Sequence, residues 1–230
     1  MNRTRFLDSS RLTSALFWLS LVGIVTGLYA AFIYAPNEKT MGVVYRIFYF
    51  HVPSAWVAFL SFLVVFVGGI MYLRTRERRW DTLALSSAEI GVVFCAIALI
   101  TGSIWGKPAW GTWWTWEPRL TTTLVLWLIY AAYLMLRRMI EEESQRARVA
   151  AVFGIVGFVD VPIVFMSIRW WRTVHPIVFT IDEIRIAPSM LTALLIALVA
   201  FTLFYLYLLI QRISLENVGH ELEALKQRVA

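Results

Sequence analysis

Six long apolar segments recur along the 230-residue chain, and they restrict it to membrane-spanning structure. A helix rises 1.5 Å per residue, so about 20 apolar residues cross the ~30 Å hydrocarbon core of a bilayer. Lipid offers no hydrogen-bond partners to a bare backbone, which favours helices over open strands. We therefore predict an all-α integral membrane protein with six transmembrane helices. The predicted spans are residues 14–34, 49–73, 84–105, 120–136, 148–168 and 187–209.

The composition excludes several other classes of protein. Hydrophobic residues make up 60% of the chain and charged residues 16%, whereas soluble domains contain ~45–50% and ~25%. A water-soluble globular domain and a disordered chain are both excluded by this difference. The net charge of +6 does not indicate nucleic acid, because the basic residues cluster beside the spans. Cys95 is the only cysteine, which excludes an intrachain disulfide, a cysteine zinc site and a C-x-x-C-H haem-attachment motif.

The distribution of basic residues predicts the orientation in the membrane. Cytoplasmic segments of membrane proteins carry an excess of Lys and Arg. The two termini and the second and fourth connections together hold 14 Lys and Arg, whereas the first, third and fifth connections hold seven. Both termini are therefore expected in the cytoplasm, with the odd-numbered connections on the outer face.

The chain divides into a membrane domain, residues 1–210, and a tail, residues 211–230. No repeat of 20–50 residues is visible in the sequence. In the tail, apolar residues recur at alternating spacings of three and four, which predicts a cytoplasmic amphipathic helix. The residues are Leu215, Val218, Leu222, Leu225 and Val229. Such a helix is long enough to contact a partner, and a solvated helix end explains the pattern equally well.

Tryptophan is concentrated on the predicted outer side. Eight of the 11 tryptophans lie in outward connections or at outer ends of spans, whereas an aromatic belt would mark both interfaces. Residues 105–119, WGKPAWGTWWTWEPR, contain five of them, and the glycines and prolines there predict an irregular connection or a short interfacial piece. Indole faces can stack on a large planar ligand, while Lys107 and Arg119 can bind its carboxylates. We favour such a ligand platform over a loop that dips into the lipid headgroups.

Two of the three histidines flank this tryptophan segment. His51 lies at the outer end of the second span, and His175 lies in the third outward connection. Two imidazoles on one face beside an aromatic platform suit the six-coordinate iron of haem. Zinc would need three or four closely spaced ligands, and an electron-transfer cytochrome would place histidine pairs within its spans. Structural histidines explain the same positions, and the residues alone leave both interpretations open.

Two carboxylates fall within predicted spans, where ionisable groups are costly and often functional. For Glu89 and Asp160 we favour a structural role, such as a hydrogen bond or a bend at Asp160, over coupling to ions. The alternative is a secondary transporter that uses both groups. It predicts discontinuous helices and an internal repeat, and the sequence shows no repeat.

Three motifs resemble those of a known family. They are FYFHVPSAW at 48–56, WGTWWTWEPRLTT at 110–122, and VDVPIV followed by SIRWW and His175 at 159–175. They are similar to motifs of the membrane haem-handling proteins of cytochrome c assembly, and among these to the short six-span CcmC family of the system I pathway. The resemblance covers nearly the whole chain. This chain has Glu117 where the family pattern usually has Asp.

The resemblance implies a function at the bacterial plasma (inner) membrane. A protein of this family would bind haem at the outer face and deliver it to a membrane-anchored chaperone, CcmE, for c-type cytochrome biogenesis. It would be a transfer component without a catalytic site of its own, holding haem b non-covalently and transiently. His51 and His175 would be the axial ligands, and the other haem contacts would be Trp110, Trp113, Trp114, Trp116, Glu117 and Arg119. The implied partners are CcmE, CcmD, the ABC transporter subunits CcmA and CcmB, and membrane lipid, with no nucleic acid.

Overall fold

The computed structural model is all-helical and describes residues 3–171 and 186–229. Within this part of the chain, six helical stretches are long and apolar enough to cross a membrane, which confirms the predicted class. One of the six stretches is formed by two consecutive helices, α5 and α6. The helices are α1 (Arg3–Tyr29) with a π-helical end (Ala30–Tyr34), a 3-10 turn (Val43–Ile47), α2 (Phe48–Thr75), α3 (Arg78–Trp110), α4 (Pro118–Met139), α5 (Glu143–Gly157), α6 (Asp160–Trp170) and α7 (Pro188–Val229).

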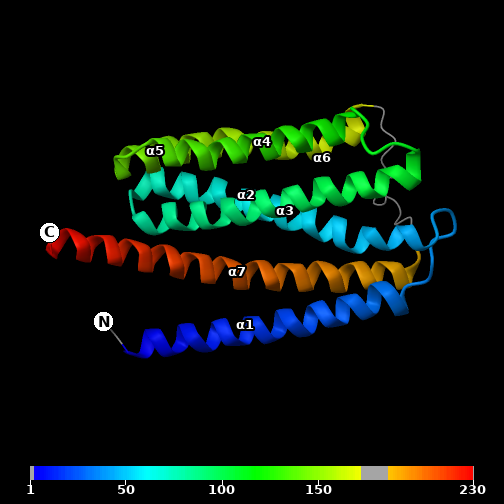
Figure 1. Cartoon of the computed structure of the whole chain (residues 1–230), viewed down its shortest axis with the longest axis horizontal. Coiled ribbons are helices and arrows are strands. Elements are labelled where there is room, and N and C mark those ends of the chain that lie inside the picture. The colour runs from blue at the N-terminus through cyan, green and yellow to red at the C-terminus, as the bar shows by residue number, and fades with distance from the viewer. Residues whose placement is uncertain (1–2, 172–185, 230) are drawn as a thin grey trace.

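The helices lie side by side along the long axis of the molecule, with both ends of the chain at the same end of the bundle (Figure 1). The central pair is α2 and α3; α4, α5 and α6 pack on one side of it and α7 on the other. The main neighbour of α1 is α7. These two helices approach closely at Gly23, where an added Cβ would lie 3.2 Å from the Cα of Ala200.

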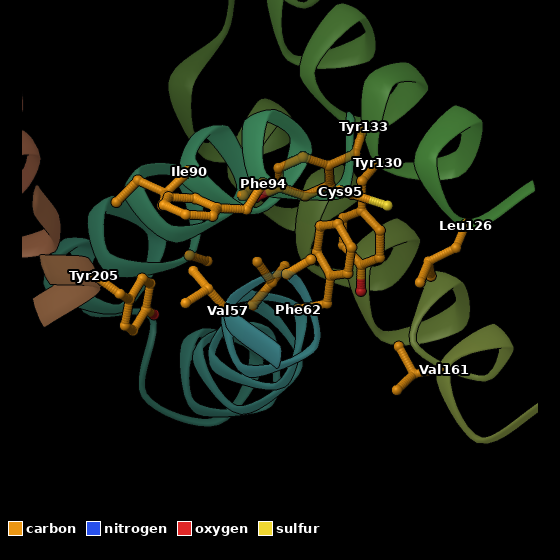
Figure 2. Packing of buried hydrophobic residues seen from close by; sticks show 14 of the residues in the cluster. Val57, Phe62, Ile90, Phe94, Cys95, Leu126, Tyr130, Tyr133, Val161 and Tyr205 are labelled. Atoms are coloured by element: carbon orange, nitrogen blue, oxygen red, sulfur yellow. The ribbon is translucent and has the colours of Figure 1, made fainter. Parts of the chain in front are cut away.

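The core between the central helices is largely aromatic. Figure 2 shows Phe62 of α2 against Tyr130 of α4, and the two rings stack with centroids 3.8 Å apart. On the α3 side, Gly91 is needed for close packing, because a Cβ there would lie 2.7 Å from Cε1 of Phe62. Contacts of this kind fix the rotation and axial register of α2, α3 and α4 relative to one another.

Ion pairs tie the helices together near the end that holds the termini. Arg137 of α4 donates two hydrogen bonds, of 2.5 and 2.7 Å, to the carboxylate of Asp81 on α3. Arg212 of α7 donates to Glu89 of α3 at 3.0 Å through Nη2 and to Glu216 at 2.8 Å. The carboxylate of Glu89 is therefore paired within the bundle, which agrees with the structural role favoured for it.

The fifth predicted span is formed by two consecutive helices, because α5 and α6 are separated at Phe158 and Val159. Together they make one stretch that is long and apolar enough to cross a membrane. Pro162 has no N–H, so it cannot bond the carbonyl of Phe158 four residues earlier. The N–H of Val161 donates to that carbonyl instead, at 3.0 Å, which tightens the turn. Asp160 opens α6 at this break, as expected for a residue placed at a bend.

The sixth predicted span and the helix predicted for the tail are one helix, because α7 continues without interruption for 42 residues to Val229. Such a helix is about 63 Å long, roughly twice the thickness of the hydrocarbon core. Its last turns project beyond the other helices at the end where the termini lie (Figure 1). The apolar residues of the tail remain exposed there: Leu215, Val218, Leu222 and Leu225.

Candidate ligand-binding site

A cavity opens between α2, α3 and α4 at the end of the bundle away from the termini. It combines residues that are far apart in the sequence. Four of the predicted site residues line it: His51, Trp110, Trp114 and Arg119. The cavity therefore joins an imidazole, two indoles and a guanidinium at one place.

His51 lies in the first turns of α2 and is held by one face of α3. Its Nδ1 is 3.1 Å from the hydroxyl oxygen of Thr101. An added Cβ on Gly102 would lie 3.1 Å from Cε1 of the ring, and Trp105 contacts the ring edge-on at a centroid distance of 5.9 Å. The sequence interpretation missed Thr101 and Gly102; a polar residue beside glycine near the outer end of an apolar span was the available signal.

Trp105 belongs to a buried aromatic cluster rather than to an exposed platform. The side chain is 3% exposed and packs edge-on against Tyr45 and Phe48. Its indole N–H donates to the sulfur of Met41 at 3.3 Å. Because the indole is held from several sides, Trp105 gives His51 a rigid neighbour.

The tryptophan segment differs in part from the prediction. Its first six residues are helical, because α3 continues through Pro108 to Trp110. Proline so close to the helix end removes only the bond to the carbonyl of Ile104. The helix stops at Gly111, whose φ of 78° suits glycine. Lys107 donates to the carbonyl of Gly111 at 3.0 Å, so in this structure its ammonium supports the helix end.

Residues 111–117 form the irregular part and present tryptophans to the surroundings. Trp113 is 58% exposed and Trp116 is 77% exposed, whereas Trp114 turns toward the cavity. Trp114 and Trp116 contact each other edge-on, with centroids 5.8 Å apart. The loop holds its own shape, since the hydroxyl of Thr112 donates to the carbonyl of Trp114 at 3.1 Å.

The first residues of α4 position two charged groups of the tryptophan segment, Glu117 and Arg119, beside the cavity. Pro118 occupies the first turn, where its missing N–H costs nothing. Glu117 stands at the N-cap position, and Arg119 follows on the wall of the cavity. The proline limits the freedom of the link, so the carboxylate and the guanidinium are held close in the chain.

The remaining predicted ligand, His175, lies outside the described residues. The helix that leads toward it is described, because α6 ends at Trp170 at the same end of the bundle as the cavity (Figure 1). Trp170 and Trp171 are about half exposed and contact each other edge-on, with centroids 5.8 Å apart.

The cavity has a volume of about 50 Å³, which is room for only a few waters, since one water needs ~10–15 Å³ on the same measure. A macrocycle therefore cannot enter the cavity as it stands, and it would lie along the opening against the exposed indoles. Polar groups without partners also occur in the loop formed by residues 111–117. The buried indole nitrogen of Trp114 and the hydroxyl of Thr115 have no hydrogen-bond partner among the described residues. Buried donors are nearly always paired in native structures, so such groups fit a site that accepts a polar ligand.

The sequence as a whole matches the haem exporter protein C family, CcmC, over residues 2–228. The chain belongs to the CcmC family. It is 36% identical over 210 residues to haem exporter protein C of Bradyrhizobium diazoefficiens, covering 90% of this chain and 80% of that protein. It is 32% identical over 231 residues to the Rhodobacter capsulatus protein of the same name, covering 99% and 96%. A CcmC-like mitochondrial protein of Marchantia polymorpha, described as a putative cytochrome c biosynthesis protein, is 36% identical over 160 residues, or 67% of this chain and 68% of that protein.

Membership in the CcmC family confirms the resemblance drawn from the three motifs. The match to the CcmC family extends over α1 and α7 as well as the tryptophan segment. The whole bundle is therefore that of a haem exporter protein C relative, and the cavity beside His51 is its candidate ligand site.

Proposed function

We propose that this CcmC-family protein binds haem at the outer face of the bacterial inner membrane and passes it to the membrane-anchored chaperone CcmE for c-type cytochrome biogenesis. The observation that carries the proposal is the single cavity lined by His51, Trp110, Trp114 and Arg119. These residues supply an iron ligand, stacking surfaces and a cation for a propionate. The names of the relatives, haem exporter protein C, support the same cargo.

Each predicted residue has a role in this proposal. His51 and His175 are the axial ligands of haem b, which is held non-covalently and transiently. The exposed indoles of Trp113 and Trp116 stack on the macrocycle, and Glu117 orients Arg119. The cavity is too small to enclose haem, so one edge of the macrocycle stays accessible. An accessible edge suits release to a chaperone, whereas a buried cofactor site would not.

The proposed orientation places the cavity outside the cytoplasm. The chain ends lie together at the far end of the bundle (Figure 1), and the segments predicted to be cytoplasmic carry twice as many Lys and Arg as the others. In this arrangement the cavity faces CcmE, while the exposed lipid-facing helices and the projecting tail are available to CcmD, CcmA and CcmB. The protein acts as a transfer component and has no proposed catalytic residues.

The function is tested with the protein purified in detergent and given haem. We expect a Soret band that stays with the protein through gel filtration. After purified CcmE apoprotein is added, the band should move from the fractions of this protein to those of CcmE. A colourless protein that drives proton-coupled uptake in vesicles would contradict the proposal and favour a secondary transporter. That alternative gains support from the break between α5 and α6, but the pairing of Glu89 with Arg212 counts against a free coupling group.

Arg119 allows a sharper test of how haem is held. A guanidinium grips a carboxylate through paired N–H donors, whereas an ammonium gives a point contact. Hydrogen bonds to charged groups contribute ~1.5–3 kcal/mol, so Arg119→Lys is expected to weaken haem binding about tenfold or more. Affinity is measured by titration of both proteins with haem and with its dimethyl ester. We expect the ester to bind both proteins about equally poorly.

Two results would contradict the role of Arg119 as a propionate clamp. One is an unchanged affinity of Arg119→Lys for haem, as expected of a surface charge worth ~0–1 kcal/mol. The other is a preference for arginine that persists with the ester, because the ester has no free carboxylate to bind.

A further inference from the structure

We infer that Thr101 is a positioning residue that holds His51 in the tautomer with the proton on Nδ1, which leaves Nε2 as the iron-binding atom. The inference rests on the proposed haem site and goes beyond it, because it assigns a function to a residue of α3 that does not itself contact the ligand. The observation behind it is the 3.1 Å separation between Nδ1 of His51 and the hydroxyl oxygen of Thr101.

The direction of this hydrogen bond follows from the other bonds of the hydroxyl. Thr101 donates to the carbonyl of Ile97 at 2.7 Å and contacts the carbonyl of Ala98 at 3.2 Å. A threonine hydroxyl has one proton to donate and lone pairs that accept. Because the hydroxyl oxygen lies within donor distance of these two carbonyls, we assign its proton to them, and the hydroxyl then accepts from His51. In this assignment Nδ1 carries the proton.

The same face of α3 also fixes the orientation of the ring. Gly102 lets the ring approach the helix, because a Cβ there would lie 3.1 Å from Cε1 of His51. Trp105, one turn after Thr101, contacts the ring edge-on and is itself anchored to the sulfur of Met41. The imidazole is therefore held by a hydrogen bond, a close backbone and a rigid indole.

Such support changes how an imidazole binds a metal. A histidine that donates its second N–H to an acceptor has a fixed tautomer and a more basic ligand nitrogen, and loss of such a partner typically weakens metal binding 10–100-fold. A more basic nitrogen favours ferric over ferrous iron because it stabilises the higher charge. Thr101 is thus expected to strengthen retention of ferric haem in particular.

The tautomer can be tested without haem. The full-length protein in detergent is labelled with ¹⁵N-histidine, and the His51 signals are assigned by their absence from His51→Ala. We expect the wild-type protein and Thr101→Ser, which keeps the acceptor, to show a protonated Nδ1. Thr101→Val removes the acceptor and is expected to shift the ring toward the Nε2–H tautomer. If Thr101→Val does not fold, Thr101→Ala makes the same test with a smaller side chain.

A second readout uses bound haem. Thr101→Val is expected to lower the affinity for ferric haem about tenfold with little change for ferrous haem, which raises the midpoint potential by ~59 mV for one electron. Thr101→Ser should restore both values. The matched control is Thr26→Val in α1, which removes the same kind of bond to a carbonyl four residues earlier, at 2.8 Å, at a residue that does not line the cavity.

The outcomes separate this inference from the proposed function. If His51→Ala binds haem with a wild-type spectrum, the axial role of His51 fails, while the tautomer experiment still decides whether Thr101 holds the ring. If haem binds through His51 but Thr101→Val has the wild-type tautomer and potential, the inference is overturned. A change of potential in Thr101→Ser as large as that in Thr101→Val would also overturn it.

Discussion

We expect His51→Ala and His175→Ala each to weaken the retention of haem and to abolish the loading of the chaperone, which is the largest effect we expect of any variant. Loss of the residue that hydrogen-bonds a metal-binding histidine typically weakens metal binding 10–100-fold. Loss of an axial ligand itself should therefore weaken haem binding more. The measurement is the Soret band after gel filtration, together with the amount of CcmE that carries haem. Added imidazole should restore part of the binding by occupying the vacated position on the iron.

The third histidine provides a matched control. His220 lies in the C-terminal part of α7, where its Nε2 is 3.5 Å from Glu216. The C-terminus of α7 lies at the opposite end of the bundle from the start of α4, whose residues line the cavity (Figure 1). His220→Ala should leave the spectrum unchanged. Wild-type spectra for both His51→Ala and His175→Ala would show that other groups ligate the iron and would overturn the axial assignment.

The second large effect is expected from the tryptophans. Replacing Trp113, Trp114 and Trp116 together by alanine should leave the protein inserted in the membrane and weaken haem binding by roughly one to three decades. Each stacked aromatic contact contributes ~0.5–1.5 kcal/mol beyond its buried area. Holo-chaperone formation is measured at equal membrane levels of the two proteins, and haem affinity is measured in detergent.

Trp18 gives the control for the loss of an exposed indole as such. It is 59% exposed on α1 and does not line the cavity. Trp18→Ala should not change haem binding. If the triple variant loads the chaperone as well as the wild-type protein does, the tryptophans serve only to anchor the loop in the membrane, and the platform proposal is wrong.

Sequence patterns were sufficient for the class of fold because the bilayer sets the length and polarity of each span. The number of spans follows from the apolar runs alone. The ends of helices were predicted less well, since local bonds decide them. Gly111 rather than Pro108 ends α3, and Pro162 divides the fifth span. In the tail, α7 continues because nothing in its sequence interrupts the helix.

For the site, residue types made the histidines, the tryptophan segment and Arg119 candidates, and the family resemblance then implied His51, Trp110, Trp114 and Arg119 as haem contacts. These four residues line one cavity in the structure. That these four residues hold haem stays a prediction, as do the roles of Trp113, Trp116, Glu117 and His175.

Only the tertiary structure brought Thr101 to His51 and Asp81 to Arg137. The partners of each pair are more than 45 residues apart and lie on different helices. Hydropathy indicates whether a segment prefers lipid to water. It does not determine how a span is rotated about its own axis, because an apolar helix remains stable in lipid in every rotation. Which faces meet is decided by close packing at sites such as Gly91 against Phe62, because a small change in rotation or register would bring backbone and side chains into collision.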